Sequence, residues 1–331
     1  MSAPAAGMRG GGSRLAALQN QLRDRPSLVL VGVLLFLVLL IGVIRPGTIG
    51  ATWVGNTILF AAPLGIVAAG QTLVMLTAGI DLSVAAVMTA AAYVAASQSY
   101  FGSIRAVLLA LAVGLAVGLL NGLGVAVFRV QPLIMTLGTG LVVSGSLLVY
   151  SLNVSHQGPP AVPDIVRFVG AGKLLEIVPV SAFLWAAIAT IVIVGLRQTG
   201  FGRLVYAIGD NPVACRLAGI RGWLVLLVTY VICGFLSAVA GLVLVGAINA
   251  ADLSLGDVYL LPSVAAVVIG GTSIYGGNGG YAGSLIGALI LTVLSSLFTL
   301  LDAPDPLKQI LYGAIVVLLA AVYVRTAGDT G

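Results

Sequence analysis

Long apolar segments recur along almost the whole chain, and they restrict the possible folds more than any other feature. They lie at 28–44, 57–78, 82–97, 104–128, 132–152, 179–196, 223–248, 259–273, 281–301 and 307–324. A helix needs about 20 mostly apolar residues to cross the hydrocarbon layer of a bilayer, and a helix satisfies its own backbone hydrogen bonds there. We therefore predict an all-α polytopic membrane protein with about ten transmembrane helices.

The charge content supports this class of fold. Only 8% of the 331 residues are charged, whereas a soluble domain carries roughly 25%. We predict a transmembrane domain over 28–325, with a cytoplasmic N-terminal tail at 1–27 and a C-terminal tail at 326–331. The segments 82–97 and 259–273 are short and rich in alanine and small polar residues, so the sequence leaves open whether they span fully.

The distribution of positive charge predicts the orientation, because cytoplasmic loops of membrane proteins are enriched in lysine and arginine. With ten spans and a cytoplasmic N-terminus, ten cations fall inside: Arg9, Arg14, Arg23, Arg25, Arg129, Arg197, Arg203, Arg216, Arg221 and Arg325. Five fall outside: Arg45, Arg105, Arg167, Lys173 and Lys308. We therefore expect both termini in the cytoplasm, an extracytoplasmic loop at 153–178 and a cytoplasmic loop at 197–222.

Ten helices divide into two sets of five, and five is an odd number. A duplicated half would then sit upside down relative to the other half, as in many transporters. The glycine-rich turns near Gly79 and Gly276 are the one hint of such a repeat in the sequence. The fold expected is a pair of inverted five-helix halves.

Several polar residues interrupt the apolar segments. They are Gln71, Thr72, Thr77, Asp81, Ser83, Asn121, Thr136 and Thr139. Polar groups at membrane depth normally face the interior of the bundle or a water-filled cavity, so as a set we predict that they line the path of a hydroxylated solute. The alternative for each threonine or serine is a hydrogen bond back to its own helix.

Asp81 lies in the stretch Gly79 to Ser83, which has the pattern of a break followed by a helix start. An aspartate there can accept hydrogen bonds from free backbone N–H groups and favours the positive end of the helix dipole. We predict that Asp81 caps a helix. Proton relay and direct contact with the substrate are the less favoured interpretations.

The cytoplasmic loop contains the signals of a short helix. Asp210 or Asn211 can cap its start, Pro212 fits its first position, and Gly219 can end it. Taken as a bare pattern, this helix serves equally well as a docking surface or as an ordinary connector.

Catalytic and metal-binding patterns are missing from the sequence. Cys215, Cys233 and the single His156 lack the spacing of a metal site. No Gly-x-x-x-x-Gly-Lys-Ser/Thr loop is present, and Gly172-Lys173 continues with leucine. We predict no catalytic residues, no metal and no cofactor. The chain is then not an enzyme, and if ATP drives it, a separate subunit must hydrolyse the ATP.

Four stretches resemble the motifs of the permease subunits of ribose-, xylose- and galactose-type ABC importers, a branch of the branched-chain amino acid/monosaccharide permease superfamily. They are 70–84, 131–139, 203–220 and 268–279, in the order of that family. The sequence departs from its pattern at Ala85, at Ala86 and at Asp210, where glycine is common. The first two can change helix packing beside the path, and Asp210 adds a charge beside the coupling helix.

The resemblance implies a bacterial inner-membrane permease that imports a monosaccharide or similar small polyol by alternating access. It implies three partners, namely a cytoplasmic ABC ATPase, an extracytoplasmic solute-binding protein and a second permease copy, identical or paralogous, in membrane lipid and without nucleic acid. It also implies that the cytoplasmic loop couples to the ATPase through Gly202, Arg203, Asn211, Ala214, Arg216 and Gly219. The alternatives are a branched-chain amino acid or nucleoside ABC permease and, from another class, a secondary carrier.

Overall fold

The structure is a computed structural model that describes residues 26–154, 161–174 and 177–328. In these residues the chain forms thirteen α-helices and one short antiparallel hairpin, which confirms the predicted all-α class. Of the predicted tails, only residues 26–27 and 326–328 lie within the described part.

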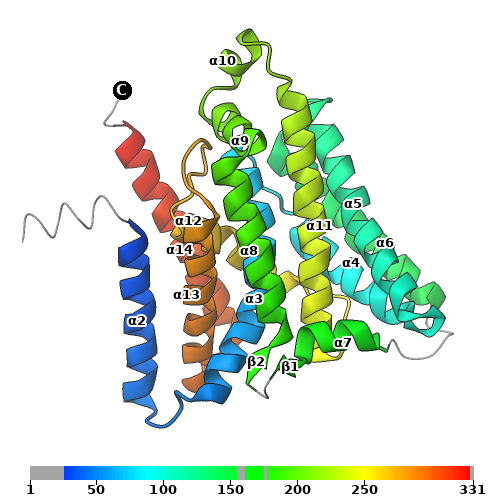
Figure 1. Cartoon of the computed structure of the whole chain (residues 1–331), viewed down its shortest axis with the longest axis vertical. Helices are drawn as coiled ribbons and strands as arrows, with labels where there is room; N and C mark the ends of the chain where they lie inside the picture. The colour runs from blue at the N-terminus through cyan, green and yellow to red at the C-terminus, as the bar shows by residue number, and fades with distance from the viewer. Residues whose placement is uncertain (1–25, 155–160, 175–176, 329–331) are drawn as a thin grey trace, which may run out of the picture.

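Each of the ten predicted segments contains one helix (Figure 1). They are α2 Pro26–Ile44, α3 Ala51–Leu76, α4 Val84–Ser97, α5 Ser103–Ala126, α6 Pro132–Val154, α8 Val180–Gln198, α11 Gly222–Ile248, α12 Leu260–Ile269, α13 Tyr281–Leu300 and α14 Asp305–Gly328. The sequence therefore located all ten helices, with boundaries that differ by a few residues.

The helices differ in their capacity to cross a membrane. In the described part, α3, α5, α6, α8, α11 and α13 are long and apolar enough to span, and shorter apolar helices lie at Leu28–Ile44, Val84–Ser97 and Asp257–Ile269. At 1.5 Å per residue, the 14 residues of α4 and the 10 of α12 extend only about 21 and 15 Å. The hydrocarbon layer is about 30 Å thick, so neither α4 nor α12 crosses it alone.

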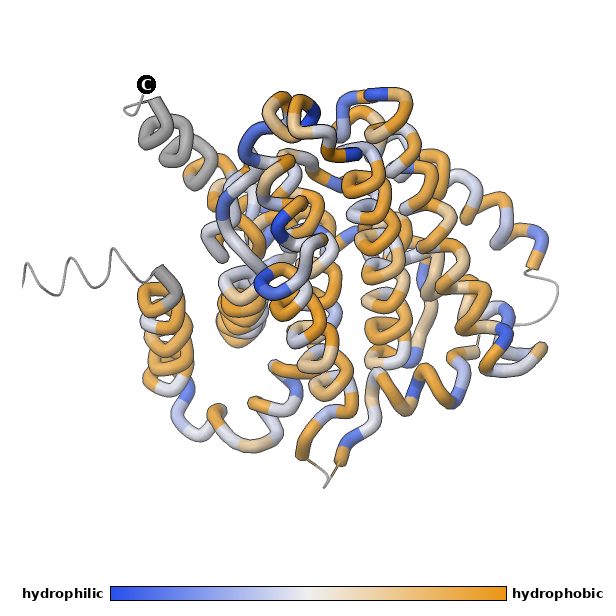
Figure 2. The backbone as a smooth tube through the Cα atoms, turned by 45° about the horizontal axis from the view of Figure 1, so that its top comes forward, coloured by the Kyte–Doolittle hydropathy of each residue, from blue (hydrophilic) through white to orange (hydrophobic). Residues whose placement is uncertain are grey.

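Polar connections gather at the two ends of the bundle. One end carries α9 Gly200–Asp210 and α10 Pro212–Leu217, and we name it the α9 end. The other carries α7 Asp164–Ala171 and the strands β1 Lys173–Leu174 and β2 Val178–Pro179, and we name it the α7 end. Two 3₁₀ turns, η1 Ser99–Phe101 and η3 Asp257–Tyr259, complete the elements. Hydrophilic residues concentrate near these ends and apolar residues between them (Figure 2), the pattern of a membrane protein.

Helices α3 and α11 form the centre of the bundle. Every residue of α3 from Ala61 to Leu76 is buried, and α11 packs against α3, α4, α5 and α7. Close approach depends on glycine: a Cβ atom at Gly114 or Gly118 of α5 would collide with the backbone of α11, and one at Gly234 of α11 would collide with α5. Small residues of this kind allow helices to pack tightly within lipid.

The packing of the two halves supports the predicted inversion. If α3, α4, α5 and α6 are exchanged for α11, α12, α13 and α14, the contacts correspond. Helix α3 packs on α13 and α12 as α11 packs on α5 and α4, and α4 contacts α5 and α6 as α12 contacts α13 and α14. The chain thus contains two similar four-helix arrangements, preceded by α2 in one half and by α8 in the other.

A repeated turn gives the register between the halves. Asp81-Leu82-Ser83 precedes α4, and Asp252-Leu253-Ser254 precedes α12, at an offset of 171 residues (252 − 81). In both turns the aspartate Oδ1 accepts hydrogen bonds from the N–H and the hydroxyl of the serine two residues later. In both, the residue three positions before the aspartate is left-handed, with φ of 61° at Ala78 and 56° at Asn249.

The glycine-rich turns near Gly79 and Gly276 are not equivalent positions of the repeat. Gly79 and Gly276 are neighbours in space at the α9 end: the N–H of Gly277 donates to the Leu76 carbonyl at 3.0 Å, and a Cβ at Gly276 would come within 2.9 Å of the Ala78 nitrogen. They belong to one junction between α3 and the turn before α13, and the repeat lies in the Asp-Leu-Ser turns.

Candidate functional site

The break between α3 and α4 holds a buried carboxylate. Asp81 is 1% exposed, and its Oδ1 accepts from the Ser83 N–H at 2.8 Å and from the Ser83 hydroxyl at 2.6 Å. The Asn121 amide of α5 donates to the Ser83 hydroxyl at 2.8 Å. Asp81 therefore stabilises the turn that leads into α4. Ser83 flanks the helix and makes no side-chain capping bond, so Asp81 holds the turn just before α4, where its Oδ1 accepts from a backbone N–H as a capping aspartate does.

Thr136 of α6 joins the same cluster. Its hydroxyl oxygen accepts from the Leu82 N–H at 3.0 Å and lies 3.2 Å from the Ile80 carbonyl and 3.0 Å from the carbonyl of Pro132 in its own helix. The structure thus brings four of the predicted path residues together, from the α3–α4 break, α5 and α6.

Four buried polar groups of the central region have unused hydrogen-bonding atoms. Within the described part of the chain, the Gln71 amide, Asp81 Oδ2, Asn121 Oδ1 and the Tyr230 hydroxyl make no hydrogen bond. A Cβ on Gly79 would lie 2.5 Å from that hydroxyl, which places Tyr230 at the same break. Unpaired polar atoms are costly at membrane depth, so this region has hydrogen-bonding capacity that the protomer itself leaves unused.

The remaining predicted path residues lie apart from this cluster or bond locally. Thr72 donates to its own Ala68 carbonyl and contacts the Ser284 hydroxyl of α13 at 2.8 Å. Thr77 and Thr139 donate to carbonyls of their own helices. Thr77 and Thr139 therefore follow the alternative of a hydrogen bond back to their own helix, whereas Thr72 and Thr136 also bond to other helices or turns. A role in the path stays a prediction for the whole set.

The predicted cytoplasmic loop, 197–222, has the capping geometry that its sequence predicts. The Asn211 side chain accepts from the Ala214 N–H at 2.9 Å, so Asn211 and not Asp210 caps α10, with Pro212 first in the helix. At its other end, Gly219 N–H donates to Arg216 O and Ile220 N–H to Cys215 O, both at 3.0 Å. This is a Schellman motif, and it requires the φ of +74° that glycine provides at 219.

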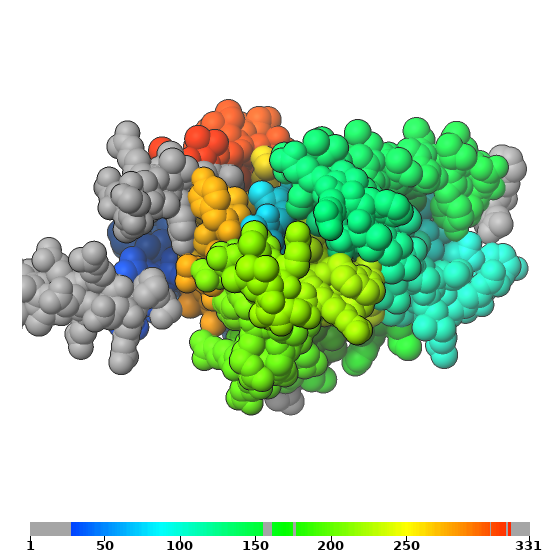
Figure 3. All heavy atoms as spheres, turned by 90° about the horizontal axis from the view of Figure 1, so that it is seen from above, coloured from blue at the N-terminus to red at the C-terminus, as the bar shows by residue number. Residues whose placement is uncertain are grey.

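The loop presents an apolar surface that the sequence analysis missed. Val213 and Leu217 are 63% and 84% exposed, and their spacing of four residues puts them on one side of α10. Of the predicted coupling residues, Arg203, Asn211, Ala214, Arg216 and Gly219 are exposed and Gly202 is buried. Seen from the α9 end, α9 and α10 stand out over the bundle (Figure 3). The apolar pair at i and i+4 between the two caps was the available signal.

Helix α9 is in direct contact with the α3–α4 break. A Cβ at Gly209 would collide with the Leu76 carbonyl and come within 2.5 Å of the Gly277 nitrogen. Tyr206 donates to the Gly279 carbonyl at 2.9 Å. Burial raises the pKa of the Tyr206 phenol more than the nearby Arg197 lowers it, so Tyr206 keeps its proton for this bond. A displacement of α9 would therefore reach both the break and the turn before α13.

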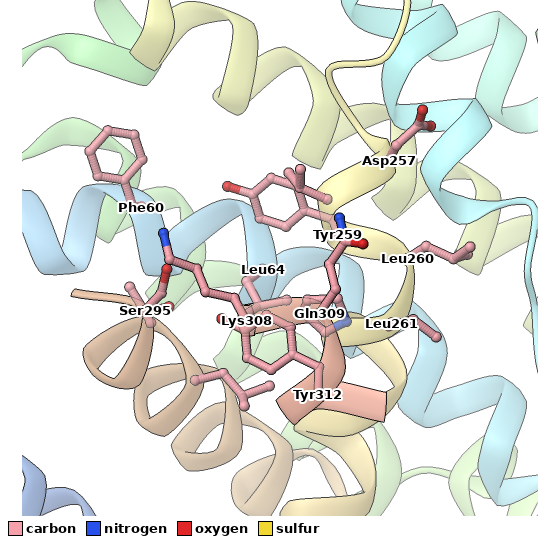
Figure 4. A pocket seen from close by; sticks show the side chains of 14 residues that line it. Phe60, Leu64, Asp257, Tyr259, Leu260, Leu261, Ser295, Lys308, Gln309 and Tyr312 are labelled. Atoms are coloured by element: carbon pink, nitrogen blue, oxygen red, sulfur yellow. The ribbon is translucent and has the colours of Figure 1, made fainter. Parts of the chain in front are cut away.

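A cavity of about 430 Å³ lies between α3, η3, α12, α13 and α14, on the α7 side of the bundle. Polar and aromatic side chains line it, with Lys308, Gln309 and Tyr312 projecting from α14 and Tyr259 from η3 (Figure 4). None of the predicted path residues belongs to its lining. Sequence reasoning missed this site because its residues come from helices that are distant in the chain.

Comparisons with known proteins agree with this architecture. The family model described as "Branched-chain amino acid transport system / permease component" matches residues 53–320. The fructose import permease protein FrcC of Rhizobium meliloti is 34% identical over 319 residues, covering 93% of this chain and 88% of the relative. The ribose import permease protein RbsC of Escherichia coli K12 is 35% identical, covering 91% and 93%. The galactofuranose transporter permease protein YtfT of that organism is 34% identical, covering 79% and 76%.

No solved structure matches the chain. The family model covers most of the ten-helix bundle, and the relatives extend over nearly the full length of the chain. The chain belongs to the family of permease components of the branched-chain amino acid transport type.

Proposed function

We propose that the protein is the membrane-spanning subunit of an ATP-driven importer for a monosaccharide or a similar small polyol. The observation that carries the proposal is near full-length similarity to permeases named for the import of ribose and fructose. The sequence has no phosphate-binding loop for ATP. A separate ATPase subunit therefore supplies the energy, and this chain provides the path.

The exposed face of α10 is the proposed contact with that ATPase. Val213 and Leu217 offer an apolar centre, and Arg203 and Arg216 are also exposed on this loop. Apolar anchors with a polar surround are typical of protein interfaces. A displacement of α10 would also displace α9 and the α3–α4 break, because Gly209 of α9 packs directly on the carbonyl of Leu76.

The other parts of the assembly follow from the predicted orientation. The α9 end faces the cytoplasm, with both termini on that side, and the α7 end faces a solute-binding protein. A second permease copy, identical or paralogous, completes the path in the bacterial inner membrane. Within this chain the unused hydrogen-bonding atoms of Asp81, Asn121 and Gln71 support a role for the predicted set in contacting a hydroxylated solute during transport. Differential contacts of this kind are what an alternating-access cycle needs.

The substrate is tested by uptake. The permease is reconstituted in proteoliposomes with its ATPase subunit and binding protein, and uptake of labelled D-ribose, D-fructose, D-galactose and L-leucine is measured with and without ATP. We expect ATP-dependent uptake of at least one sugar and none of leucine. Uptake of leucine alone, or sugar uptake that needs no ATPase, would contradict the proposal.

The coupling surface is tested in the same preparation. Leu217→Gln and Arg203→Ala should leave the protein in the membrane and remove most of the solute-stimulated ATP hydrolysis, since the docking surface is lost. Gly219→Val should have the same effect through strain at its positive φ. Leu174→Gln is the matched control for membrane insertion and folding, because Leu174 is an exposed apolar residue at the opposite, α7 end. Normal stimulation in the three loop variants would refute this interface.

A further inference from the structure

The repeated halves allow the cavity at the α7 end to be compared with its counterpart in the same chain. At the offset of 171 residues, Asp257 and Tyr259 correspond to Ala86 and Met88. The Pro-Leu pair that opens α14 (306–307) matches the one that opens α6 (132–133), at an offset of 174 (306 − 132). At this second offset, Lys308, Gln309 and Tyr312 correspond to Ile134, Met135 and Gly138.

The two halves therefore differ in chemistry at the same place in the fold. The second half has a carboxylate, an amine, an amide and two phenols where the first half has apolar residues or glycine. In the first half the start of α6 packs on the α3–α4 break, with Thr136 bonded to the Leu82 N–H and Gly140 against Ser83. In the second half a cavity of about 430 Å³ lies between α12, α13 and α14. The polar side chains that line this cavity are therefore not a feature that the two halves share.

The lining also defines what kind of ligand fits. One formal cation, Lys308, and one formal anion, Asp257, belong to the lining, which favours a neutral ligand over an anion. Thr292, Ser295 and Gln309 add hydroxyl and amide groups, while Phe60, Tyr259 and Tyr312 add aromatic surface. Polar groups on an otherwise apolar wall fix the orientation of a small molecule. A solute with many hydroxyl groups and an apolar ring face matches both the polar groups and the aromatic surface of the lining.

We propose that this cavity is a binding site for a neutral polyhydroxylated solute of the sugar class, placed on the α7 side of the permease ahead of the α3–α4 break. The inference rests on the proposed function, because it names where the imported solute first contacts this subunit. The solute passes from the cavity toward the centre of the assembly when the permease changes state.

Direct binding tests the site without the rest of the cycle. The permease is placed in nanodiscs of neutral lipid, and binding of D-ribose and D-fructose is measured by saturation-transfer NMR and by equilibrium titration. We expect the wild-type protein to bind the sugar that the complex transports. Gln309→Ala and Tyr312→Phe should each weaken binding about tenfold, the effect of one lost hydrogen bond of about 1.4 kcal/mol.

Two control variants separate this site from general damage. Ile310→Ala changes the neighbouring residue of α14, which is 68% exposed and not part of the lining, and Met135→Ala changes the counterpart of Gln309 in the first half. Both should bind sugar like the wild type. Thermal unfolding of each variant checks that it is folded, and Tyr312→Phe retains the aromatic ring.

The outcomes distinguish the two proposals. If the wild-type complex transports no sugar, the proposed function fails. If the complex transports a sugar but the permease alone does not bind it, or Gln309→Ala and Tyr312→Phe bind it normally, the cavity inference fails while the function stands. A second set of nanodiscs contains anionic lipid, and binding of that lipid is measured for the wild type and for Lys308→Ala. If sugar binding is absent and Lys308→Ala weakens the binding of anionic lipid, the cavity is a lipid headgroup site and the inference is overturned.

Discussion

Among single residues, Asp81 and Asp252 form the same turn in two different surroundings. Asp81 is buried at the α3–α4 break, and Asp252 is exposed at the α7 end. Each accepts two hydrogen bonds from the serine two residues later. The molecule thus contains its own control for the energetic effect of burying this turn.

Substitution of Asp81 should separate acceptor function from charge. Asp81→Asn retains an oxygen that can accept from the Ser83 N–H, so the thermal stability and transport of this variant should stay close to wild type. Asp81→Ala leaves a buried N–H unpaired and should cost about 1–3 kcal/mol. Asp252→Ala, in water, should cost under about 1 kcal/mol. Melting in detergent measures all three, and equal behaviour of the two Asp81 variants would argue against capping.

Acid should weaken the hydrogen bonds of the exposed turn at Asp252. Hydrogen bonds from Ser254 hold the pKa of Asp252 below its usual range. Because the folded pKa is depressed, the stabilisation is complete above the unfolded value of about 3.9 and is lost as the pH falls through the lower folded value. Hydrogen exchange at the Ser254 amide should therefore lose protection, relative to the intrinsic rate, below about pH 4. Unchanged protection down to pH 2 would contradict this.

At the scale of elements, the contact between α9 and the end of α3 is the connection on which the proposed coupling depends. Gly209 provides it, since any side chain there would collide with the Leu76 carbonyl. The neighbouring hydrogen bond from Tyr206 to Gly279 ties α9 to the turn before α13. The loop that carries α9 and α10 is consequently in contact with the central helices.

Gly209→Ala should uncouple ATP hydrolysis from transport. The new methyl group forces α9 away from α3, so we expect ATP hydrolysis to continue while uptake falls by at least tenfold. Gly195→Ala in α8 is the matched control, because nothing lies within 4 Å of a Cβ there. It should raise stability by up to about 1 kcal/mol through the helix preference of alanine. Uptake and hydrolysis by Gly209→Ala that both match the wild type would refute the connection.

The elements also show what the sequence could and could not predict. Apolar length located all ten helices, and local signals narrowed the cap to Asp210 or Asn211 and located the stop at Gly219. The contact of Gly209 with Leu76 and the cavity beside Tyr312 depend on residues that are far apart in the chain, so no local pattern reports them. The helix count predicted the inverted halves, but their register was missed, because three identical residues, Asp-Leu-Ser, are a weak signal without the matching hydrogen bonds and the left-handed residue before them.

For the whole molecule, the predicted orientation can be measured by cysteine accessibility. In a background where Cys215 and Cys233 are replaced by serine or alanine, Lys173→Cys should react with a membrane-impermeant maleimide in intact spheroplasts. Val213 is 63% exposed, and a Val213→Cys variant should react only after lysis. The reverse pattern would show that the topology is inverted, and the proposed ATPase surface on α10 would then lie outside the cytoplasm.

The paired left-handed residues after α5 and α13 bear on how this protein is made. Arg129 and Asp302 follow the two equivalent helices with φ of 56° and 52°, so the same backbone bend carries opposite charges. The insertion machinery must thread two similar halves in opposite directions, and the backbone gives it no means of telling them apart. In the predicted topology Arg129 lies on the cytoplasmic side, as the positive-inside rule favours, and Asp302 lies on the other side. The orientation of the two inverted halves during insertion is therefore set by side chains such as Arg129 and not by the backbone path that the halves share.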